Sequence, residues 1–249
     1  MNLKNKVILV TGSSSGIGQA IAIACAKKDA IVLINYKTNK IGAEETLEKV
    51  KEYSKGFIFQ TDLTDEKQIE KMFQAIANEV DTIDCLVNNA GDSQGGDFFD
   101  NKMWKYQFDN VFFSAVHVTQ QFLKQNNKNL KKIVNISSAY GNLDGGNPDF
   151  IAYSAAKAAM QSMTITLAKN NDHILVNAIA PGYVSTHKET INLSAQDKKE
   201  WSEEMVCGRF IKPEEIAEAV VGLLEDDSRN GEIVKEYKGL SFELKNNAN

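Results

Sequence analysis

Short apolar runs alternate with longer amphipathic stretches along almost the whole of this chain. An uninterrupted apolar run is typical of a strand buried on both faces, whereas apolar residues that recur every three or four positions indicate a helix. The runs predict strands at residues 7–10, 31–34, 57–60, 83–87, 133–136, 175–179 and 233–234. Helices are expected between them, at residues 19–28, 41–53, 65–77, 102–124 and 213–224, with a further helix around Tyr153.

Strands that alternate with helices of this length predict an α/β fold, a doubly wound parallel sheet of the Rossmann type with helices on both faces. We expect a single domain over residues 1–249, because no linker, internal repeat or second apolar core interrupts the pattern. Residues 186–210 are polar and loosely patterned, which indicates either a substrate loop or lid, or an inert surface insertion. In such a sheet, ligands bind beyond the carboxyl ends of the strands.

Composition narrows the functional classes. The 249 residues are 43% hydrophobic and 24% charged, an ordinary balance for a globular protein. A net charge of −5 without a basic tract gives no electrostatic support for nucleic-acid binding. No apolar run is long enough to span a membrane or form a signal peptide, so we expect a cytoplasmic protein without a membrane partner. The three cysteines and three histidines are scattered, which predicts neither a disulfide framework nor a metal site.

A glycine-rich segment directly follows the first predicted strand and opens the first predicted helix. Glycines in this context allow a tight turn and let backbone N–H groups approach a pyrophosphate, whose charge the helix N-terminus attracts. A plain glycine-rich loop is the alternative interpretation. The candidate cofactor-binding residues of this segment are Gly12, Ser14, Ser15, Gly16, Ile17 and Gly18.

The residue at the end of the second predicted strand bears on the choice of cofactor. A carboxylate there would bond the ribose hydroxyls of NAD and repel a 2′-phosphate. This chain has Asn35 instead, followed two residues later by the cation Lys37. The pattern favours NADP(H), although it leaves NAD(H) open because an amide can also bond a ribose hydroxyl.

Tyr153 and Lys157 are four residues apart, so a helix would place them on one face. A phenol is a poor proton donor at neutral pH, and a nearby ammonium lowers its pKa. The pair could therefore form an acid–base group. By itself the spacing is weak evidence, since it occurs by chance in many helices. The glycine-rich turn, the segment 88–91 and Ser138 strengthen it, because all are expected at the same edge of the sheet.

Taken together, these motifs resemble the short-chain dehydrogenase/reductase family, and most closely its 3-oxoacyl-acyl-carrier-protein reductase subgroup. The resemblance implies an NADP(H)-dependent oxidoreductase that interconverts a small-molecule carbonyl and a secondary alcohol. A sugar, alcohol or steroid dehydrogenase of the same family stays open, as does a cofactor-binding regulator with little turnover. The motifs occur in family order: Thr11-Gly-x-x-x-Gly16-x-Gly18, Asp62, Asn88-Asn89-Ala90-Gly91, Ser138, Tyr153-x-x-x-Lys157 and Pro181-Gly182.

The same resemblance implies roles for individual residues. Tyr153 is expected to be the general acid, Lys157 to lower its pKa and hold the nicotinamide ribose, and Ser138, rather than Ser137, to bond the substrate oxygen. Lys37 would lie near the 2′-phosphate. The other residues expected to face the cofactor are Asp62 and Leu63 at the adenine, Asn89, Ala90 and Gly91 at the ribose, the Pro181-Gly182 pair, and Val184 and Thr186 at the carboxamide.

Three departures from the family pattern affect these expectations. Asn110 is the only candidate for the asparagine of the family's proton relay, yet alignment on Trp104 and Thr119 places Val111 at that site. One residue turns a helix by about 100°, so either the relay is altered or a local helix irregularity restores it. The loop between Ser138 and Tyr153 is also two residues longer than in the reductase subgroup.

The third departure lies in residues 235–240, which replace the family's common ending. We expect a homo-oligomer, a dimer or a tetramer, but this segment usually contributes to subunit contacts and leaves the usual tetramer in doubt. Helix 102–124 carries more apolar residues than one stripe requires, which indicates burial against the sheet and either a partner subunit or a thick core. Asp29 stands where a helix-ending glycine is usual.

Overall fold

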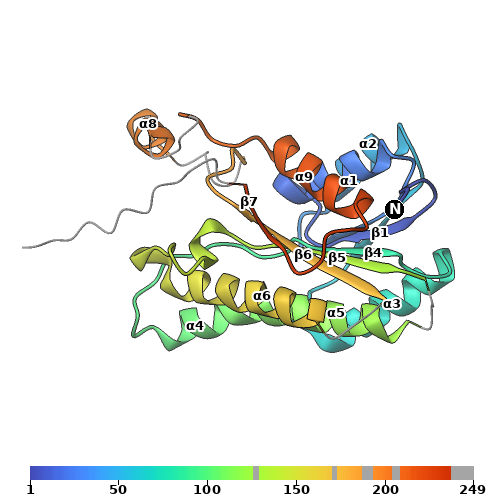
Figure 1. The fold of residues 1–249 in the computed structure, drawn as a ribbon, viewed down its shortest axis with the longest axis horizontal. Coiled ribbons are helices and arrows are strands. Elements are labelled where there is room, and N and C mark those ends of the chain that lie inside the picture. Colours follow the sequence, from blue (N-terminus) through green and yellow to red (C-terminus); the bar gives the residue numbers. More distant parts are fainter. Residues whose placement is uncertain (126–128, 170–172, 187–192, 204–207, 237–249) are drawn as a thin grey trace, which may run out of the picture.

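Parallel strands form one sheet through the middle of the molecule (Figure 1). The computed structural model describes residues 1–249 except 126–128, 170–172, 187–192, 204–207 and 237–249. The described part contains a seven-stranded sheet in the order β3-β2-β1-β4-β5-β6-β7, which confirms the predicted fold class. Its strands are β1 (Val7–Val10), β2 (Ile31–Tyr36), β3 (Gly56–Gln60), β4 (Cys85–Asn88), β5 (Lys131–Ile136), β6 (Ile174–Pro181) and β7 (Ile233–Glu236).

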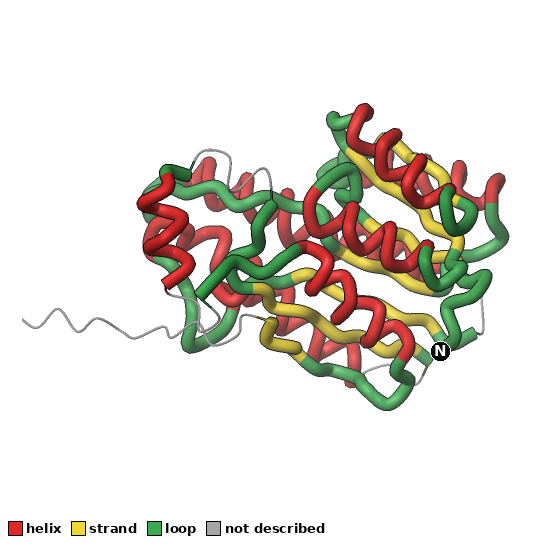
Figure 2. The backbone as a smooth tube through the Cα atoms, turned by 90° about the horizontal axis from the view of Figure 1, so that it is seen from above, coloured by secondary structure: helices red, strands yellow, loops and turns green. Residues whose placement is uncertain are grey.

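Helices cover both faces of this sheet. In Figure 1, α1 (Gly16–Ala26), α2 (Lys40–Lys51) and α9 (Pro213–Glu225) lie on one face. The opposite face carries α3 (Glu66–Glu79), α4 (Asn101–Gln107), α5 (Ser114–Lys124) and α6 (Ile151–Lys169). Helix α8 (Ala195–Glu203) stands apart from these layers, and Figure 2 shows the strands side by side beneath α1, α2 and α9.

The central strand β1 explains how the two layers are held together. All four of its side chains are buried, and alternate residues of a strand point to opposite faces. Ile8 and Val10 therefore join the apolar core under α1 and α9, whereas Leu9 joins the core under α3 and α5. Burial on both faces is the reason for the uninterrupted apolar run.

Several strand boundaries differ from the sequence prediction, and in β2 and β5 the difference places polar residues inside the sheet. Strand β2 continues to Tyr36, two residues beyond the predicted end. Lys131 and Lys132 lie inside β5, where both are buried, rather than before it. The amine of Lys132 donates to the carbonyl of Asp226 at 2.8 Å and forms an ion pair with Asp227 at 2.6 Å. These acceptors make its burial possible, because a buried charge without partners is costly.

The helix predicted over residues 102–124 is interrupted. A π-helix, η1 (Phe108–Phe113), separates α4 from α5. Within the region 186–210, the described residues include α8, which the loose sequence pattern did not predict; residues 187–192 and 204–207 lie outside the described part. Asp29 has a φ of 59°, the left-handed conformation that a helix-ending glycine would adopt. No helix in the described part has both the length and the apolar character needed to cross a bilayer.

Candidate active site

The glycine-rich turn after β1 packs directly against Asn89 and Ala90, the two residues that follow β4. Gly12 and Gly16 have φ values of 62° and 57°, which side chains other than glycine rarely adopt. A Cβ at Gly12 would lie 2.8 Å from Cα of Ala90, and a Cβ at Gly18 would lie 2.5 Å from Nδ2 of Asn89. Glycine is therefore required here both by the backbone conformation and by the close approach of two segments.

The N-terminus of α1 is left open for an anion. Its N-cap residue, Ser15, makes no side-chain capping hydrogen bond, and the first turn holds no acidic residue. By contrast, Asp65 caps α3 by accepting from the N–H groups of Lys67 and Gln68. The uncapped amides and the helix dipole of α1 favour a negatively charged group at this end. The turn and the helix together fit the pyrophosphate of a dinucleotide.

Asn89 and Thr11 hold the turn in place. The amide of Asn89 donates to the carbonyls of Thr11 at 2.9 Å and Gly12 at 3.1 Å. The hydroxyl of Thr11 accepts from the N–H groups of Asn89 at 2.9 Å and Ala90 at 3.0 Å. The side chain of Asn89 is thus used within the protein, and Gly91, which is exposed, presents backbone at the same edge.

Asn35 does not occupy the position expected from the sequence. It lies inside β2, is only 2% exposed, and its amide oxygen accepts from the N–H of Gly12 at 3.1 Å. Its Nδ2 atom faces the carbonyl of Thr61 at 3.4 Å. Asn35 therefore supports the glycine-rich turn from below instead of presenting an open amide to a ribose, because the strand extends beyond it.

Lys37 and Asp62 meet beyond the carboxyl ends of β2 and β3. Lys37 Nζ lies 2.8 Å from Oδ2 of Asp62, and Oδ1 of Asp62 accepts from the backbone and hydroxyl of Thr64. Partial burial pushes the pKa of Asp62 upward, but the hydrogen bonds from Lys37 and Thr64 outweigh it and hold that pKa below its usual value. Leu63 is buried beside this pair. The structure therefore brings Lys37 and Asp62 together beyond the carboxyl ends of two neighbouring strands.

Helix α6 brings Tyr153 and Lys157 to the end of β5. Lys157 Nζ donates to the carbonyl of Ile136, the last residue of β5, at 2.6 Å. The same atom lies 5.6 Å from the centroid of the Tyr153 ring, while Tyr153 itself is half-buried. Burial of the amine disfavours its charged form and lowers the pKa of Lys157 to about 8. With a pKa of about 8 the amine is still mostly charged at pH 7, and its bond to Ile136 fixes it beside the phenol at the strand end.

Ser137 and Ser138, which follow β5, have different surroundings. Ser137 is buried, and its hydroxyl donates to the carbonyl of Lys157 at 3.2 Å and accepts from Gln161 at 3.1 Å. Ser138 is half-exposed, and its hydroxyl oxygen accepts from the N–H of Tyr140 at 3.2 Å. The hydroxyl of Ser137 thus fixes α6, whereas Ser138 is the more exposed of the two serines.

Gln161 ties together three parts of the site, and sequence reasoning did not identify it. It lies one turn after Lys157, and its Nε2 atom approaches Ser137 Oγ, the Ser138 carbonyl and Asn142 Oδ1 at 3.1 to 3.2 Å. Its spacing of four residues from Lys157 was the available signal, because it places both on one face of α6.

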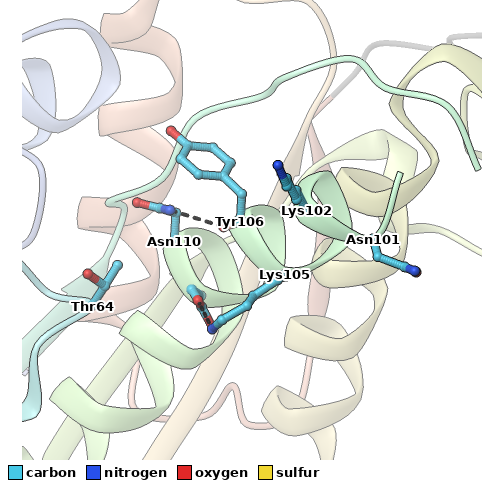
Figure 3. A pocket seen from close by; sticks show the side chains of 7 residues that line it. Thr64, Asn101, Lys102, Lys105, Tyr106 and Asn110 are labelled. Atoms are coloured by element: carbon cyan, nitrogen blue, oxygen red, sulfur yellow. Dashed lines mark hydrogen bonds and ion pairs between the residues drawn. The ribbon is translucent and has the colours of Figure 1, made fainter. Parts of the chain in front are cut away.

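Asn110 lies in the π-helix η1, which packs against α6. Its amide donates to the carbonyl of Tyr106 at 3.0 Å (Figure 3). The N–H of Ser114 bonds to the carbonyl of Asp109, five residues earlier, and the Ser114 hydroxyl donates to the Asn110 carbonyl at 2.7 Å. A helix irregularity is therefore present at the position where the sequence suggested one.

A hollow of about 400 Å³ lies beside Asn110 (Figure 3). Its walls come from α4, η1 and the residue that precedes the Asp65 cap of α3. It is lined by Thr64, Asn101, Lys102, Lys105, Tyr106, Asp109 and Asn110. In this hollow Lys105 forms an ion pair with Asp109. The carboxylate of Asp109 thus neutralises the positive charge that Lys105 brings to the hollow.

The segment after β6 returns to the glycine-rich turn. Pro181 ends β6, and the N–H of Gly182 donates to the carbonyl of Glu236 in β7 at 3.2 Å. Val184 is buried and forms a parallel bridge with Ile211. A Cβ at Gly16 would lie 3.2 Å from Cγ2 of Thr186. The structure thus brings the Pro181–Thr186 segment and the turn together at one edge.

The sequence profile of a known family, described as short chain dehydrogenase, matches residues 6–197. The chain belongs to the short-chain dehydrogenase family. A similar member is the 3-oxoacyl-[acyl-carrier-protein] reductase FabG of Aquifex aeolicus (strain VF5), which is 37% identical over 91% of this chain and 92% of that protein. Glucose 1-dehydrogenase 2 of Bacillus subtilis (strain 168) is 31% identical over 91% of this chain and 90% of that protein.

Solved structures show the same family likeness. The Pseudomonas aeruginosa RhlG/NADP active-site complex has a TM-score of 0.87 and 28% identity, and the match covers 96% of this chain and 97% of that chain. As a short-chain dehydrogenase, this chain is an oxidoreductase that acts on CH–OH groups or the corresponding carbonyls. No cluster of potential metal ligands occurs among the residues that the structure describes.

A buried polar chain beneath the short-chain dehydrogenase site also escaped sequence reasoning. Asn88 Nδ2 donates to Thr119 at 3.0 Å and to Asn135 at 2.9 Å. The amide of Asn135 in turn donates to the Thr164 hydroxyl at 2.8 Å. The Thr164 hydroxyl then donates to the carbonyl of Met160. These hydrogen bonds link β4, β5, α5 and α6, and they therefore fix α6, which carries Tyr153 and Lys157, relative to the strands.

Proposed function

We propose that this chain is an NADP(H)-dependent oxidoreductase in which Tyr153 is the general acid for carbonyl reduction. The observation that carries this proposal is the buried Lys157 amine, held by the carbonyl of Ile136 and 5.6 Å from the Tyr153 ring centroid. A positive charge beside a phenol favours its ionised form, so the proton leaves the phenol more readily. In the oxidative direction the same phenolate accepts the proton from the alcohol.

The remaining roles follow from the same strand end. Ser138 donates a hydrogen bond to the substrate oxygen, where negative charge develops during reduction. The bound nicotinamide cofactor supplies the hydride. The open N-terminus of α1 and the turn around Gly12 and Gly16 hold its pyrophosphate, and Lys157 bonds its ribose. Asn110 is proposed to belong to the proton relay behind Lys157. The packing of η1, which carries Asn110, against α6, which carries Lys157, supports this role.

We further propose a preference for NADP(H) over NAD(H). Lys37 supplies a cation at the end of β2, and the similar RhlG structure is an NADP complex. The substrate is a 3-oxoacyl thioester or a related ketone, a class favoured by the likeness to FabG. A sugar or other alcohol is the alternative, favoured by the likeness to glucose 1-dehydrogenase 2.

A homo-oligomer is part of the proposal. Phe113 at the end of η1 is 42% exposed, and Ile165 on α6 is 38% exposed. Exposed apolar side chains on adjacent helices favour an interface between copies of the chain. Sedimentation should show a dimer or tetramer, and a monomer at micromolar concentration would contradict this part.

Turnover tests the proposal directly. The purified chain should oxidise NADPH in the presence of an acetoacetyl thioester, or reduce NADP⁺ in the presence of glucose. The variant Tyr153→Phe should lose at least about 10²-fold in rate, since it removes the proton donor. The matched control Tyr53→Phe changes an exposed tyrosine after α2 and should keep the wild-type rate.

The alternative is a cofactor-binding regulator. It is favoured by Val111, which stands buried at the family's asparagine position. It predicts tight NADPH binding without turnover of either the acetoacetyl thioester or glucose. A Tyr153→Phe variant that keeps the wild-type rate would reject the assigned mechanism, whereas binding without turnover by the wild type would favour the regulator.

A further inference from the structure

Five aromatic rings from separate segments meet beside the candidate catalytic residues. Tyr183, which follows β6, stands at their centre. Its ring stacks on Trp201 of α8 with centroids 5.0 Å apart, and lies 6.0 Å from Phe210. Tyr140 meets Tyr183 edge-on at 6.4 Å and stacks on Phe150 at 6.1 Å. We call Tyr140, Phe150, Tyr183, Trp201 and Phe210 the aromatic wall.

The aromatic wall is joined to the reacting centre at two points. The N–H of Tyr140 donates to the Ser138 hydroxyl at 3.2 Å. Phe150 ends the short helix η3 (Pro148–Phe150), and α6 begins at the next residue with Tyr153 in its first turn. A substrate whose carbonyl lies between Ser138 and Tyr153 is therefore next to the two segments that carry Tyr140 and Phe150 of the aromatic wall.

The aromatic wall has one polar edge. The hydroxyls of Tyr140 and Tyr183 lie 3.1 Å apart and share a hydrogen bond. The amide of Asn147 donates to the Tyr140 hydroxyl at 3.1 Å. These bonds fix the two rings relative to each other, so the faces of the aromatic wall are preorganised before a ligand arrives. The longer loop between Ser138 and Tyr153 supplies both Tyr140 and Asn147.

All five rings of the aromatic wall are half-buried. A cluster of partly exposed aromatic side chains binds well to a further flat π-system, by offset stacking or edge-to-face contact. A flexible acyl chain would gain less from flat faces and would lose rotational freedom on binding. We propose that the non-reacting part of the substrate is a planar aromatic or conjugated ring system, bound against the aromatic wall. This inference rests on the proposed carbonyl reduction, and it narrows the substrate from 3-oxoacyl thioesters and related ketones to ketones that carry such a ring system.

A matched pair of ketones tests the inference. The ketones 2-tetralone and trans-2-decalone share a bicyclic frame and an unconjugated carbonyl, but only the first carries a flat aromatic ring. The wild type with its cofactor should show a kcat/KM at least about tenfold higher for 2-tetralone. Trp201→Leu should lower this value for 2-tetralone about tenfold and change that for trans-2-decalone less than about twofold.

Trp104→Leu is the matched control, because it makes the same change in the other tryptophan of the chain, in α4. It should leave the ratio of the two ketones unchanged. Equal kcat/KM values for both ketones in the wild type would overturn the inference. An equal loss for both ketones in Trp201→Leu would overturn it too. Tyr183→Phe keeps the ring and should retain most of the preference.

Equilibrium binding separates this inference from the proposed function. In Trp104→Leu, Trp201 is the only tryptophan, so its fluorescence reports on the aromatic wall. In the presence of NADP⁺, 2-naphthol should change this fluorescence at a concentration at least about tenfold lower than trans-2-decalol. If no carbonyl is turned over but 2-naphthol binds preferentially, the proposed function fails and the aromatic site stands. If turnover occurs and the two alcohols bind equally, only the aromatic site fails.

Discussion

Lys37 Nζ lies 2.8 Å from Asp62 Oδ2, so the cation expected to meet a 2′-phosphate is already paired with a carboxylate. The Lys37 side chain is 52% exposed and that of Asp62 27% exposed. Exposed ion pairs of this kind contribute only about 0–1 kcal/mol. A phosphate that carries more charge than the carboxylate can therefore compete for Lys37, which keeps the proposed NADP(H) preference consistent with the pair.

Reversal of the charge at Lys37 should reverse the cofactor preference. Lys37→Asp places a second carboxylate beside Asp62, which repels a 2′-phosphate and can accept from ribose hydroxyls. We expect NADPH to bind at least about tenfold more weakly and NADH to become the tighter ligand, as measured by quenching of protein fluorescence. Lys55→Asp makes the same change just before β3, at the amino ends of the strands and thus away from Lys37 at their carboxyl ends, and should alter neither affinity. Equal affinities of the wild type for both cofactors would reject the preference.

The activity of the free enzyme should fall above pH 8. The lowered pKa of Lys157, about 8, means that the amine loses its charge there, and with it the support for proton transfer by Tyr153. We expect kcat/KM for carbonyl reduction to decrease about tenfold per pH unit on this limb. A profile that stays flat to pH 10 would show that the charge on Lys157 does not assist the reaction.

The loss of the proton from Lys157 that lowers the activity should raise the stability of the folded chain. Between a pKa of about 8 in the folded chain and the ordinary value near 10.4, the unfolded chain keeps a proton that the folded chain has lost. The unfolded state then binds more protons, so the contribution of Lys157 to stability rises with pH through this window. Urea unfolding at pH 7.5 and 10 should show this rise in the wild type relative to Lys157→Met. An identical pH dependence in both proteins would contradict it.

The two serines after β5 should separate chemistry from stability. Ser138→Ala removes the hydroxyl proposed to bond the substrate oxygen and should lower kcat/KM by about 10²-fold, with a smaller loss of stability than Ser137→Ala, because the bond that it loses comes from the N–H of the half-exposed Tyr140. Ser137→Ala should keep most of the activity and lose about 1 kcal/mol of stability, because its hydroxyl bonds the Lys157 carbonyl and Gln161. Steady-state kinetics and urea unfolding of both variants provide the measurements. If the two effects were exchanged, Ser137 would be the substrate-binding residue.

The buried polar chain should be costly to interrupt. Thr164→Val removes the hydroxyl that accepts from Asn135 at 2.8 Å and leaves a buried amide without that partner. We expect a loss of about 1–3 kcal/mol in the free energy of unfolding. Thr164→Ser keeps the hydroxyl and should lose clearly less. A Thr164→Val variant as stable as the wild type would show that the amide finds another acceptor.

The sequence predicts the parallel α/β fold and the glycine-rich turn well because the apolar runs and the turn residues are local signals. An apolar run, a turn and a helix follow one another within about thirty residues, as a dinucleotide-binding unit requires. Asn35 was misplaced because a polar residue after an apolar run resembles a strand end. Its burial depends on the N–H of Gly12, a partner that no local pattern reveals. Lys132 was misplaced for the same reason, since its partners Asp226 and Asp227 come from the far end of the chain.

The sequence indicates that the helix near Asn110 departs from the family pattern, but it does not indicate the form of the irregularity. The spacing between Trp104 and Thr119 indicates a shift of one residue, but a π-helix, a break or an altered relay would all produce it. The aromatic wall had no sequence signal, because its rings come from segments up to seventy residues apart and each aromatic residue alone is unremarkable in its context. Tertiary contacts of this kind have no local period to detect.

The contact between Gly12 and Ala90 also limits when the chain can acquire its cofactor. Strand β1 pairs with β2 on one side and with β4 on the other, and β4 begins only at Cys85. As the chain leaves the ribosome, β1, α1 and β2 can associate early, but the turn lacks the segment against which it packs until Ala90 has emerged. Thr186, which approaches Gly16, emerges later still. The dinucleotide can therefore stabilise only a chain that is already largely synthesised. It cannot assist the first association of β1, α1 and β2.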